Sequence, residues 1–551
     1  MSKNTSLAKS ISTFSLTMTG VTTIIGSGWL LSTQKIASIA GPASLLSWCL
    51  GAAIALMVGF FYIEIGSSYP SSGGIGYYSH ITHGRFCGFL TSWINWLSIV
   101  AVPPIEAQAV IQYLSPLSPT FNRFYDVTSH NLTASGIGFA FLLMLLFMFL
   151  NYWSTKLFLR FNNFFTLLKI TIPVLTIAAL FYSGLHPQNF GTTFQEFVPF
   201  GWKSIFTSVV ACGVVMSFNG FQSPLNFSEE IASPKRQLPV AVIGSIVISL
   251  FIYILLQIVF VGSISPENLA QGWQQINFSS PYIQLLMLAN FQLLVSAVYI
   301  GSVISPGVCG VTFAASSARI MLSLSREGHM PQILGVLHPK YRTPWNAVVT
   351  STLVGTLFLL IFKGWHSLVA VISILHLFSY VPAPIVTIAN RIKHRQKRNP
   401  GQFWLPGAHI LAPILLFLLS VLIFSAGWPL ADEMALLIIP GLAFYFYYEY
   451  KERKSEPFRQ ALKGASWLIF YIAGISLITY LGSDYNHRAQ WISHSTSLIL
   501  LFGLSVVTYI YGAYFAYDHN TYVTPRDAKA QKAEPIAEDP LEDYVSELNP
   551  S

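Results

Sequence analysis

A glycine–serine–glycine triplet, Gly26-Ser27-Gly28, interrupts the first long apolar segment of the chain. Glycine weakens a helix and lets the backbone turn aside. Non-helical backbone at membrane depth is tolerated only where it is buried in protein or lines a cavity. The triplet therefore predicts a break between two half-helices. The free N–H groups that begin the second half-helix would hold a carboxylate, because helix N-termini carry partial positive charge.

A second irregularity lies in the sixth apolar segment, between Met216 and Pro224. Gly220 and Pro224 flank the polar residues Asn219 and Gln222 near the middle of this segment. A proline removes a backbone donor and bends a helix, and polar groups at that depth are costly unless they face a cavity or a partner. Glycine and proline also occur in membrane helices that only pack closely or kink. Two breaks five segments apart, however, are typical of an inverted-repeat transporter whose binding site lies between them.

Lys169 is a single charge deep within the fifth apolar segment. It follows Arg160 by nine residues, which places it roughly 13 Å from the segment's start at 1.5 Å per residue. An ammonium at this depth must find partners or lose its proton, or its long side chain must reach back to the membrane surface.

Three further ionisable residues lie in apolar segments. Glu106 follows Pro103-Pro104 in the third segment, where a carboxyl can carry a proton, shape selectivity or make a structural hydrogen bond. Glu64 lies near the end of the second segment, where a structural role is expected. His376 in the tenth segment either faces the site and selects acidic side chains or packs as an ordinary buried histidine.

The composition predicts a polytopic membrane protein. Of the 551 residues, 53% are hydrophobic and only 9% are charged, whereas a soluble domain carries about 25% charged residues. The net charge of +8 comes from Lys and Arg beside membrane segments, so it does not indicate nucleic acid as a partner. The four cysteines have no metal-binding or CxxC spacing and are expected to be free. No cleavable signal peptide is expected.

The elements that must position these residues are apolar segments of membrane-spanning length, predicted to be helices. We count fourteen, at residues 12–39, 43–67, 84–114, 134–153, 161–183, 203–228, 239–262, 282–322, 346–362, 367–392, 406–426, 434–450, 462–481 and 495–517. Residues 12–183 and 203–392 would form the two repeats, with helices 1–5 and 6–10. Residues 406–517 would add four helices, residues 1–11 an N-terminal segment, and residues 518–551 a solvated, disordered tail.

The positive charges predict the orientation. Most of the 30 Lys and Arg fall in loops on the side of the N-terminus, and only Lys35, Arg123, Lys203, Lys363 and Arg488 fall in loops on the opposite side. By the positive-inside rule both termini are then cytoplasmic, in the inner or plasma membrane.

Short motifs in segments 1 to 9 resemble those of the amino acid–polyamine–organocation (APC) permeases. The motifs are Ile25-Gly26-Ser27-Gly28, Glu64 to Gly74, Gly220-Phe221, Glu229 to Pro239, Ser316 to Arg319, Arg326 to Pro331, and Thr343 to Ala347. Ala40-Gly41-Pro42, Asn151 to Ser154 and the two extra C-terminal segments look most like the aspartate–proton symporter branch.

This resemblance implies an all-α, five-plus-five inverted-repeat fold, similar to the leucine transporters, with helices 1 and 6 discontinuous. It implies alternating access, with an amino acid and a proton as partners and the lipid bilayer as surroundings; no cofactor, metal ion or nucleic acid is implied. The substrate-binding residues it implies are Ile24, Gly26, Ser27, Gly28, Trp29, Phe218, Asn219, Gly220 and Gln222. The amides of Ser27 and Gly28 would take the carboxylate, and the carbonyls of Ile24, Phe218 and Asn219 the ammonium.

The same family places a lysine at Lys169, where its ammonium substitutes for a sodium ion and links segment 1 to segment 8. Lys169 is therefore our candidate for proton coupling or for organisation of the site. Glu106, as a carboxyl within an apolar segment, is the candidate for a second proton carrier. One departure from the family is Met216, where some relatives have a gating aromatic. Trp29, Phe218 or Phe221 would then have to close over the substrate.

The function predicted is secondary amino acid transport, by proton-coupled uptake with an acidic amino acid such as aspartate or glutamate. Exchange of an amino acid for another or for an amine is the alternative of the same fold, and a membrane-embedded sensor is the alternative of another class. An enzyme is not expected, because no catalytic constellation is found. A channel would need a selectivity element, and none stands out. The oligomeric state is left open.

Overall fold

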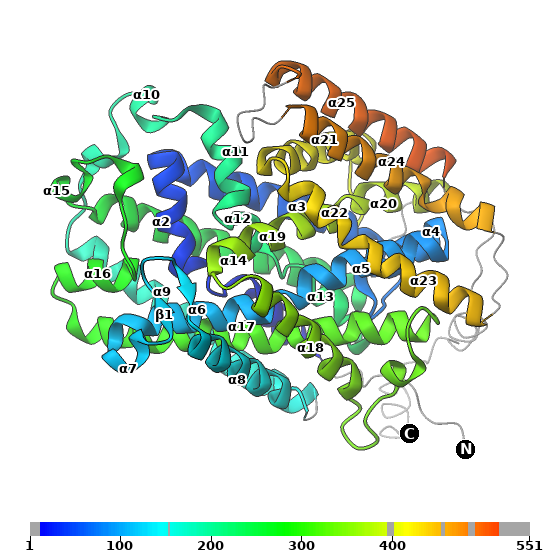
Figure 1. The fold of residues 1–551 in the computed structure, drawn as a ribbon, viewed down its shortest axis with the longest axis horizontal. Helices are drawn as coiled ribbons and strands as arrows, with labels where there is room; N and C mark the ends of the chain where they lie inside the picture. Colours follow the sequence, from blue (N-terminus) through cyan, green and yellow to red (C-terminus); the bar gives the residue numbers. More distant parts are fainter. Residues whose placement is uncertain (1–10, 153–154, 394–401, 453–457, 483–490, 517–551) are drawn as a thin grey trace, which may run out of the picture.

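The computed structural model describes residues 11–152, 155–393, 402–452, 458–482 and 491–516. This part is an almost wholly helical bundle (Figure 1). Its one sheet is a two-stranded hairpin in which β1 (Tyr125–Asp126) pairs antiparallel with β2 (Asn131–Leu132). The predicted tail at residues 518–551 and nearly all of the predicted N-terminal segment lie outside the described residues.

The first third of the chain contains the first interrupted helix and its neighbours. The helices are α1 (Thr13–Ile24), α2 (Gly28–Ala40), α3 (Ser44–Ser68), α4 (Gly74–His83), α5 (Arg85–Val100), α6 (Val102–Leu114), α7 (Pro119–Asn122), α8 (Ala134–Leu150) and α9 (Thr155–Tyr182). The helix α4 was not predicted, because the sequence there begins in a Ser- and Gly-rich stretch that resembles a loop.

The middle of the chain contains the second interrupted helix. Its helices are α10 (Phe194–Phe197), α11 (Gly201–Ala211), α12 (Val214–Phe218), α13 (Ser223–Asn226), α14 (Pro234–Ser263), α15 (Pro266–Leu269), α16 (Pro281–Leu288), α17 (Gln292–Arg326), α18 (Trp345–Ile361), α19 (Trp365–Tyr380) and α20 (Pro382–Lys393). The C-terminal part adds α21 (Ala408–Ala426), α22 (Leu430–Leu436), α23 (Ile438–Glu452), α24 (Phe458–Gly482) and α25 (His494–Ile510), which ends in a π-helical turn (Tyr511–Phe515).

Four segments predicted as continuous are divided in the structure. The third is interrupted at Ala101 and the tenth at Val381, in each case one or two residues before a proline that cannot donate to the preceding turn. The eighth begins with the separate helix α16, and the twelfth is interrupted at Leu437.

Ten stretches of the described residues are long and apolar enough to cross a membrane. One of them, Gly28–Ser68, joins the second half of the predicted first segment to the second segment. Two shorter apolar helices are Ala134–Leu150 and Trp345–Ile361. The chain is thus a multi-pass membrane protein, while the count of fourteen spans stays a prediction because the first and sixth segments are broken into short helices.

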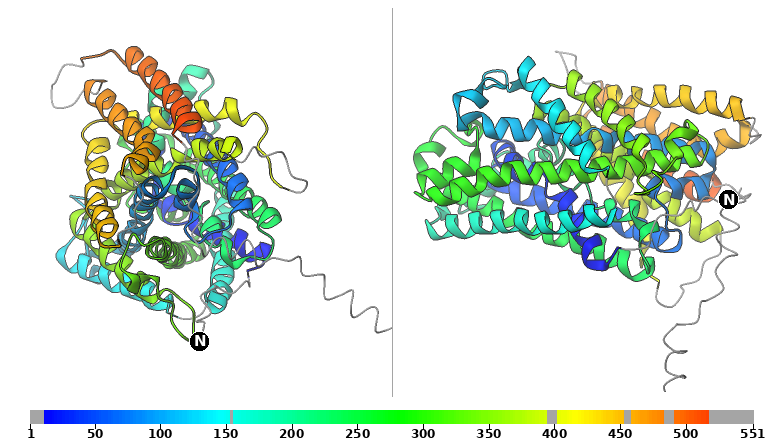
Figure 2. Two further views of the ribbon diagram at one scale, coloured as in Figure 1. Left: turned by 90° about the vertical axis from the view of Figure 1, so that its right-hand side faces the viewer. Right: turned by 90° about the horizontal axis from the view of Figure 1, so that it is seen from below.

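The interior of the bundle contains two stretches that are buried on all sides. The stretches Arg85–Leu117 and Trp365–Lys393 are almost entirely buried, so that their charged side chains Glu106 and Arg391 lie inside the protein. Helices such as α8, α9 and α25 instead present large exposed apolar side chains, among them Leu142, Phe164 and Ile499, which suits a lipid-facing surface. In Figure 2 (left) the C-terminal helices α24 and α25 lie at the periphery of the bundle.

The bundle has two distinct ends along its long axis. In Figure 1, α2 and α16 lie at the left end, α4 and α23 lie at the right end, and α17 runs nearly the whole length between them. We name the left end the vestibule end and the right end the ion-pair end, for the cavity and the charge pairs described below.

Candidate functional site

The first helix break separates α1 from α2 and holds a carboxylate of the protein itself. Residues 25–27 connect the two helices, and the Ser27 N–H donates a hydrogen bond to Glu106 Oε2 at 2.9 Å. A side chain at Gly26 would collide with the Glu106 carboxylate and with the Cys309 sulfur. The position is thus shaped for an anion at a helix N-terminus, and Glu106, which is fully buried, supplies it.

The second break lies between α12 and α13. Gly220 adopts φ 117°, and a Cβ there would collide with Thr23. Only glycine adopts this backbone conformation without strain. The structure adds an interruption that was not predicted, between α11 and α12, where Gly213 has φ 82°.

The two breaks are in direct contact. The Thr23 hydroxyl donates to the Gly220 carbonyl at 3.0 Å. Tyr253, from the middle of α14, donates to the Ile24 carbonyl at 2.7 Å and is also 3.1 Å from the Ser217 carbonyl. Tyr253 therefore ties both interrupted helices to a continuous one. Nothing in its sequence context distinguishes it from an ordinary buried tyrosine.

Lys169 is buried beside the first break. Its ammonium donates to the carbonyls of Thr22, at 2.8 Å, and of Ser305, at 3.0 Å, and so joins α1 to α17. The Ser305 hydroxyl in turn donates to the Gly26 carbonyl at 2.9 Å and accepts from Trp29 Nε1 at 3.2 Å. Lys169 is only 1% exposed, so its side chain does not reach the surface.

The polar residues of the second break bond mainly to one another. Gln222 Nε2 donates to Asn219 Oδ1 at 2.7 Å, and the Tyr380 hydroxyl lies 3.4 Å from Gln222 Oε1. Asn219 Nδ2 has no hydrogen-bond partner in the described part of the chain. The Phe218 ring packs against Trp48 and Tyr253 at centroid distances of 6.0 and 5.5 Å.

The remaining predicted residues lie close by. Gly28 packs directly against the Ser217 side chain, so its lack of a Cβ is required there. His376 bonds through Nδ1 to the Ile372 carbonyl of its own helix, at 2.8 Å, and its ring lies 6.0 Å from that of Tyr380. His376 is fully buried, and its Nε2 has no hydrogen-bond partner in the described part of the chain.

Trp365 was missed by the sequence analysis. It is the first residue of α19, and its indole N–H donates to the Ser27 hydroxyl at 3.0 Å. Trp365 thus covers the first break on the side of the vestibule end. A tryptophan directly after Gly364, at the start of an apolar segment, was the available signal.

The ion-pair end is closed by buried charge pairs. Arg391 of α20 holds Glu64 of α3 through two hydrogen bonds of 2.6 Å each, and the Leu405 N–H donates to the same carboxylate at 2.8 Å. Arg319 of α17 donates to Glu230 at 2.8 Å. Glu64 therefore has the structural role that was predicted by its position near the segment end.

One group of side chains at the ion-pair end has metal-ligating chemistry. His80, Glu327 and His329 place their ligand atoms within 4.8 Å of one another, with His80 Nδ1 3.7 Å from Glu327 Oε2. The Arg85 guanidinium donates to the Glu327 carbonyl at 3.2 Å. Because that guanidinium is a neighbouring positive charge, it opposes a cation here, and we assign the group to the contacts that hold α4 against the end of α17.

Comparisons with known proteins identify the family. A family model described as amino acid permease matches residues 11–444. The chain belongs to the amino acid permease family. The resemblance to APC permeases seen in the short motifs is thereby confirmed.

Three relatives of this permease come from Bacillus subtilis (strain 168). The glutamate/serine transporter AimA is 37% identical over 507 residues, covering 92% of this chain and 93% of its own length. The aspartate–proton symporter is 31% identical over 517 residues, covering 93% and 98%. The branched-chain amino acid permease BcaP is 26% identical over 461 residues, covering 82% and 95%. Because the family and these relatives are permeases and transporters, this permease is an amino acid transporter and not an enzyme.

Proposed function

We propose that this permease takes up acidic amino acids, such as aspartate or glutamate, together with protons, by alternating access. The names of two relatives that align over more than nine-tenths of this chain, a glutamate/serine transporter and an aspartate–proton symporter, support this substrate class and this coupling. We further propose fourteen spans in a five-plus-five inverted repeat, with α1–α2 as the discontinuous first helix and α11–α13 as the discontinuous sixth. Both termini would then be cytoplasmic, in the inner or plasma membrane, as the distribution of Lys and Arg predicts.

The hydrogen bond between the Ser27 N–H and the Glu106 carboxylate carries this proposal. In the empty permease, Glu106 occupies the place of the substrate carboxylate at the N-terminus of α2. When Glu106 takes up a proton it loses the charge that this place favours. The substrate carboxylate then replaces it on the N–H groups of Ser27 and Gly28. Substrate binding and proton binding are linked, because each favours the arrangement in which Glu106 has left the Ser27 N–H group.

The substrate ammonium would bind to backbone carbonyls on the other side of the site. The candidates are the carbonyls of Ile24, Phe218 and Asn219, which end helices or lie in the breaks. The Ile24 carbonyl already accepts from Tyr253, and a carbonyl oxygen can accept a second bond. Gln222 and Trp29 would complete the site, and Gly26 and Gly220 keep it free of side chains.

Lys169 would keep the charge balance of the site. Its ammonium interacts electrostatically with Glu106 and holds α1 to α17 through the Thr22 and Ser305 carbonyls. When a substrate carboxylate replaces ionised Glu106, the negative charge facing Lys169 is conserved. Lys169 therefore has an anionic neighbour both in the empty and in the loaded permease.

Uptake into proteoliposomes tests this function. Purified permease is reconstituted, and uptake of a labelled amino acid panel is measured with and without an imposed pH gradient, acid outside. We expect accumulation of aspartate or glutamate that depends on the gradient. Transport that requires an amino acid inside the liposomes would instead indicate exchange, and binding without any transport would indicate a sensor.

A further inference from the structure

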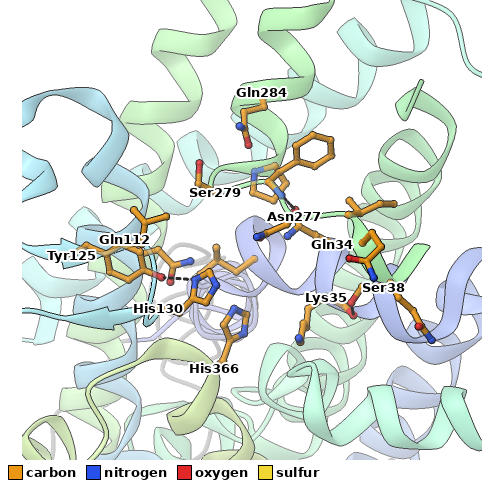
Figure 3. Close-up of a pocket in the computed structure, with 17 residues that line it drawn as sticks. Gln34, Lys35, Ser38, Gln112, Tyr125, His130, Asn277, Ser279, Gln284 and His366 are labelled. Carbon is orange, nitrogen blue, oxygen red and sulfur yellow. Dashed lines mark hydrogen bonds between the residues drawn. The ribbon is translucent and has the colours of Figure 1, made fainter. Parts of the chain in front are cut away.

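A cavity of about 510 Å³ opens at the vestibule end, outside the first helix break. Its walls come from five separate parts of the chain: α2, the end of α6, the β1–β2 hairpin, the segment before and at the start of α16, and the start of α19 (Figure 3). Cavities of about 300–1,000 Å³ are the usual size of small-molecule sites. Its volume is therefore sufficient for a free amino acid.

The cavity has positive charge without a compensating carboxylate. Lys35 lines the cavity, His130 and His366 lie on the same side, and Gln34, Gln112 and Asn277 add amide groups. No Asp or Glu is among the described residues that line it. In the described part of the chain, the Lys35 ammonium forms no ion pair and His366 Nδ1 has no hydrogen-bond partner. The Lys35 side chain is exposed, so its ammonium is available to a ligand.

The nearest carboxylate on the hairpin is bonded to its own loop. Asp126 accepts from the Thr128 N–H at 2.9 Å, from the Thr128 hydroxyl at 2.6 Å and from the Ser129 hydroxyl at 2.7 Å. These bonds lower the pKa of Asp126 to about 2, so it stays ionised and bonded to the loop at neutral pH. It therefore does not compete for the amide and histidine groups inside the cavity.

Specific contacts hold the walls in place. The Leu132 N–H donates to the Lys363 carbonyl at 2.8 Å, which docks the hairpin on the turn before α19. His130 has φ 53°, a conformation uncommon for a residue other than glycine, and its ring lies 6.5 Å from that of His366. On the opposite wall, the Phe278 N–H donates to Gln34 Oε1 at 2.9 Å.

We propose that this cavity is a second binding site, which holds an amino acid with an acidic side chain before it enters the helix break. This inference rests on the proposed function and adds to it a site that selects by charge. The side-chain carboxylate binds near Lys35 and the histidines, and the amides hold the amino acid backbone. Trp365, which adjoins His366 and bonds to Ser27, separates this site from the break and has to move when the substrate passes.

The test compares an acidic with a neutral amino acid. Uptake of labelled L-glutamate and L-serine by reconstituted permease is measured for wild type, Lys35→Gln and Lys203→Gln. Lys203 is an exposed lysine at the same end that does not line the cavity, so its variant is the matched control. We expect Lys35→Gln to lower the kcat/KM ratio of glutamate over serine about fivefold, and Lys203→Gln to leave it unchanged.

A second variant keeps the Lys35 ammonium and adds a negative charge beside it. Ser38→Asp places a carboxylate in the cavity one helical turn after Lys35 and is expected to lower the same ratio. High salt should bring the wild-type ratio toward that of Lys35→Gln, because mobile ions screen an exposed charge.

The outcomes separate the two proposals. An unchanged ratio in both cavity variants, or an equal fall in Lys203→Gln, overturns the second site and leaves the proposed function standing. A wild type that carries serine but neither glutamate nor aspartate contradicts both proposals. If serine is not carried, the glutamate KM of Lys35→Gln against Lys203→Gln decides in the same way. A wild type that transports no amino acid contradicts the proposed function itself.

Discussion

Buried charges at the ion-pair end pair with one another. At the helix break, Glu106 and Lys169 bond to the backbone, and the Lys35 ammonium in the vestibule forms no ion pair in the described part of the chain. Arg391 and Glu64 form a closed pair, as do Arg319 and Glu230. Glu106 instead holds one N–H group, at Ser27. A pair of fixed opposite charges holds helices together, while a carboxylate on a backbone N–H can be exchanged for that of a ligand. This difference distinguishes the ion-pair end, which closes the permease, from the helix break and the vestibule, which would bind the substrate.

A substitution at Gly26 tests whether the first helix break, in contrast to the ion-pair end, binds the substrate. Gly26→Val fills the space of the Glu106 carboxylate, so we expect complete loss of uptake with normal membrane insertion and a monodisperse detergent-solubilised protein. Gly138→Val is the control, because a side chain at Gly138 meets no atom within 4 Å. Normal substrate affinity in Gly26→Val would argue against a binding site for the substrate carboxylate at this break.

Removal of the buried Lys169 ammonium tests whether the helix break couples transport to protons. In Lys169→Ala the carbonyls of Thr22 and Ser305 lose their common donor, and we expect pH-gradient-driven accumulation to be abolished. Uptake is compared with Lys203→Ala, which removes an exposed lysine. Wild-type accumulation in Lys169→Ala would remove this residue from the mechanism.

A substitution at the ion-pair end should affect stability. Arg391→Met leaves Glu64, which is 3% exposed, as a buried carboxylate without its partner. Loss of one partner of a buried pair costs about 3–5 kcal/mol, so we expect a large fall in the thermal unfolding temperature in detergent. Adding Glu64→Gln should restore part of it. Equal stability of Arg391→Met and wild type would mean that this pair does not close the bundle.

The smallest expected effect is at Trp365. Trp365→Phe keeps an aromatic ring over the break but removes the hydrogen bond to the Ser27 hydroxyl. A neutral hydrogen bond contributes about 0.5–1.5 kcal/mol, so the substrate KM should rise between about twofold and tenfold. An unchanged KM and unchanged substrate dissociation would indicate that Trp365 does not cover the site.

Most of the helices of this fold and two of their breaks could be predicted from the sequence, whereas the contacts between the helices could not. Gly26-Ser27-Gly28 and Gly220 indicated breaks, because such residues have little place in an uninterrupted apolar helix. The prolines that follow Ala101 and Val381 also indicate interruptions there, but an apolar run of spanning length predicts a single helix. Periodicity does not distinguish a long helix from two short ones in line.

The bonding partners at the candidate site depend on residues far apart in the chain. Ser27 and Glu106 are 79 positions apart, and no local pattern indicates that α6 presents its carboxylate to α2. The depth of Lys169 followed from its spacing to Arg160. Its partners could not be predicted, because they are backbone carbonyls, which every residue has. Tyr253 is a single aromatic residue in apolar surroundings, where packing is the usual role. Trp365 was marked only by its place directly after Gly364, at the start of an apolar segment.

The exchange of Glu106 for the substrate carboxylate is tested most directly by Glu106→Gln. Glutamine is similar in shape and can keep the bond to the Ser27 N–H through its carbonyl oxygen, but it cannot take up a proton. Accumulation driven by a pH gradient and exchange of labelled for unlabelled substrate are measured in the same proteoliposomes. We expect gradient-driven accumulation to be lost while exchange continues. Accumulation at the wild-type level, with the same dependence on the gradient, would contradict the account.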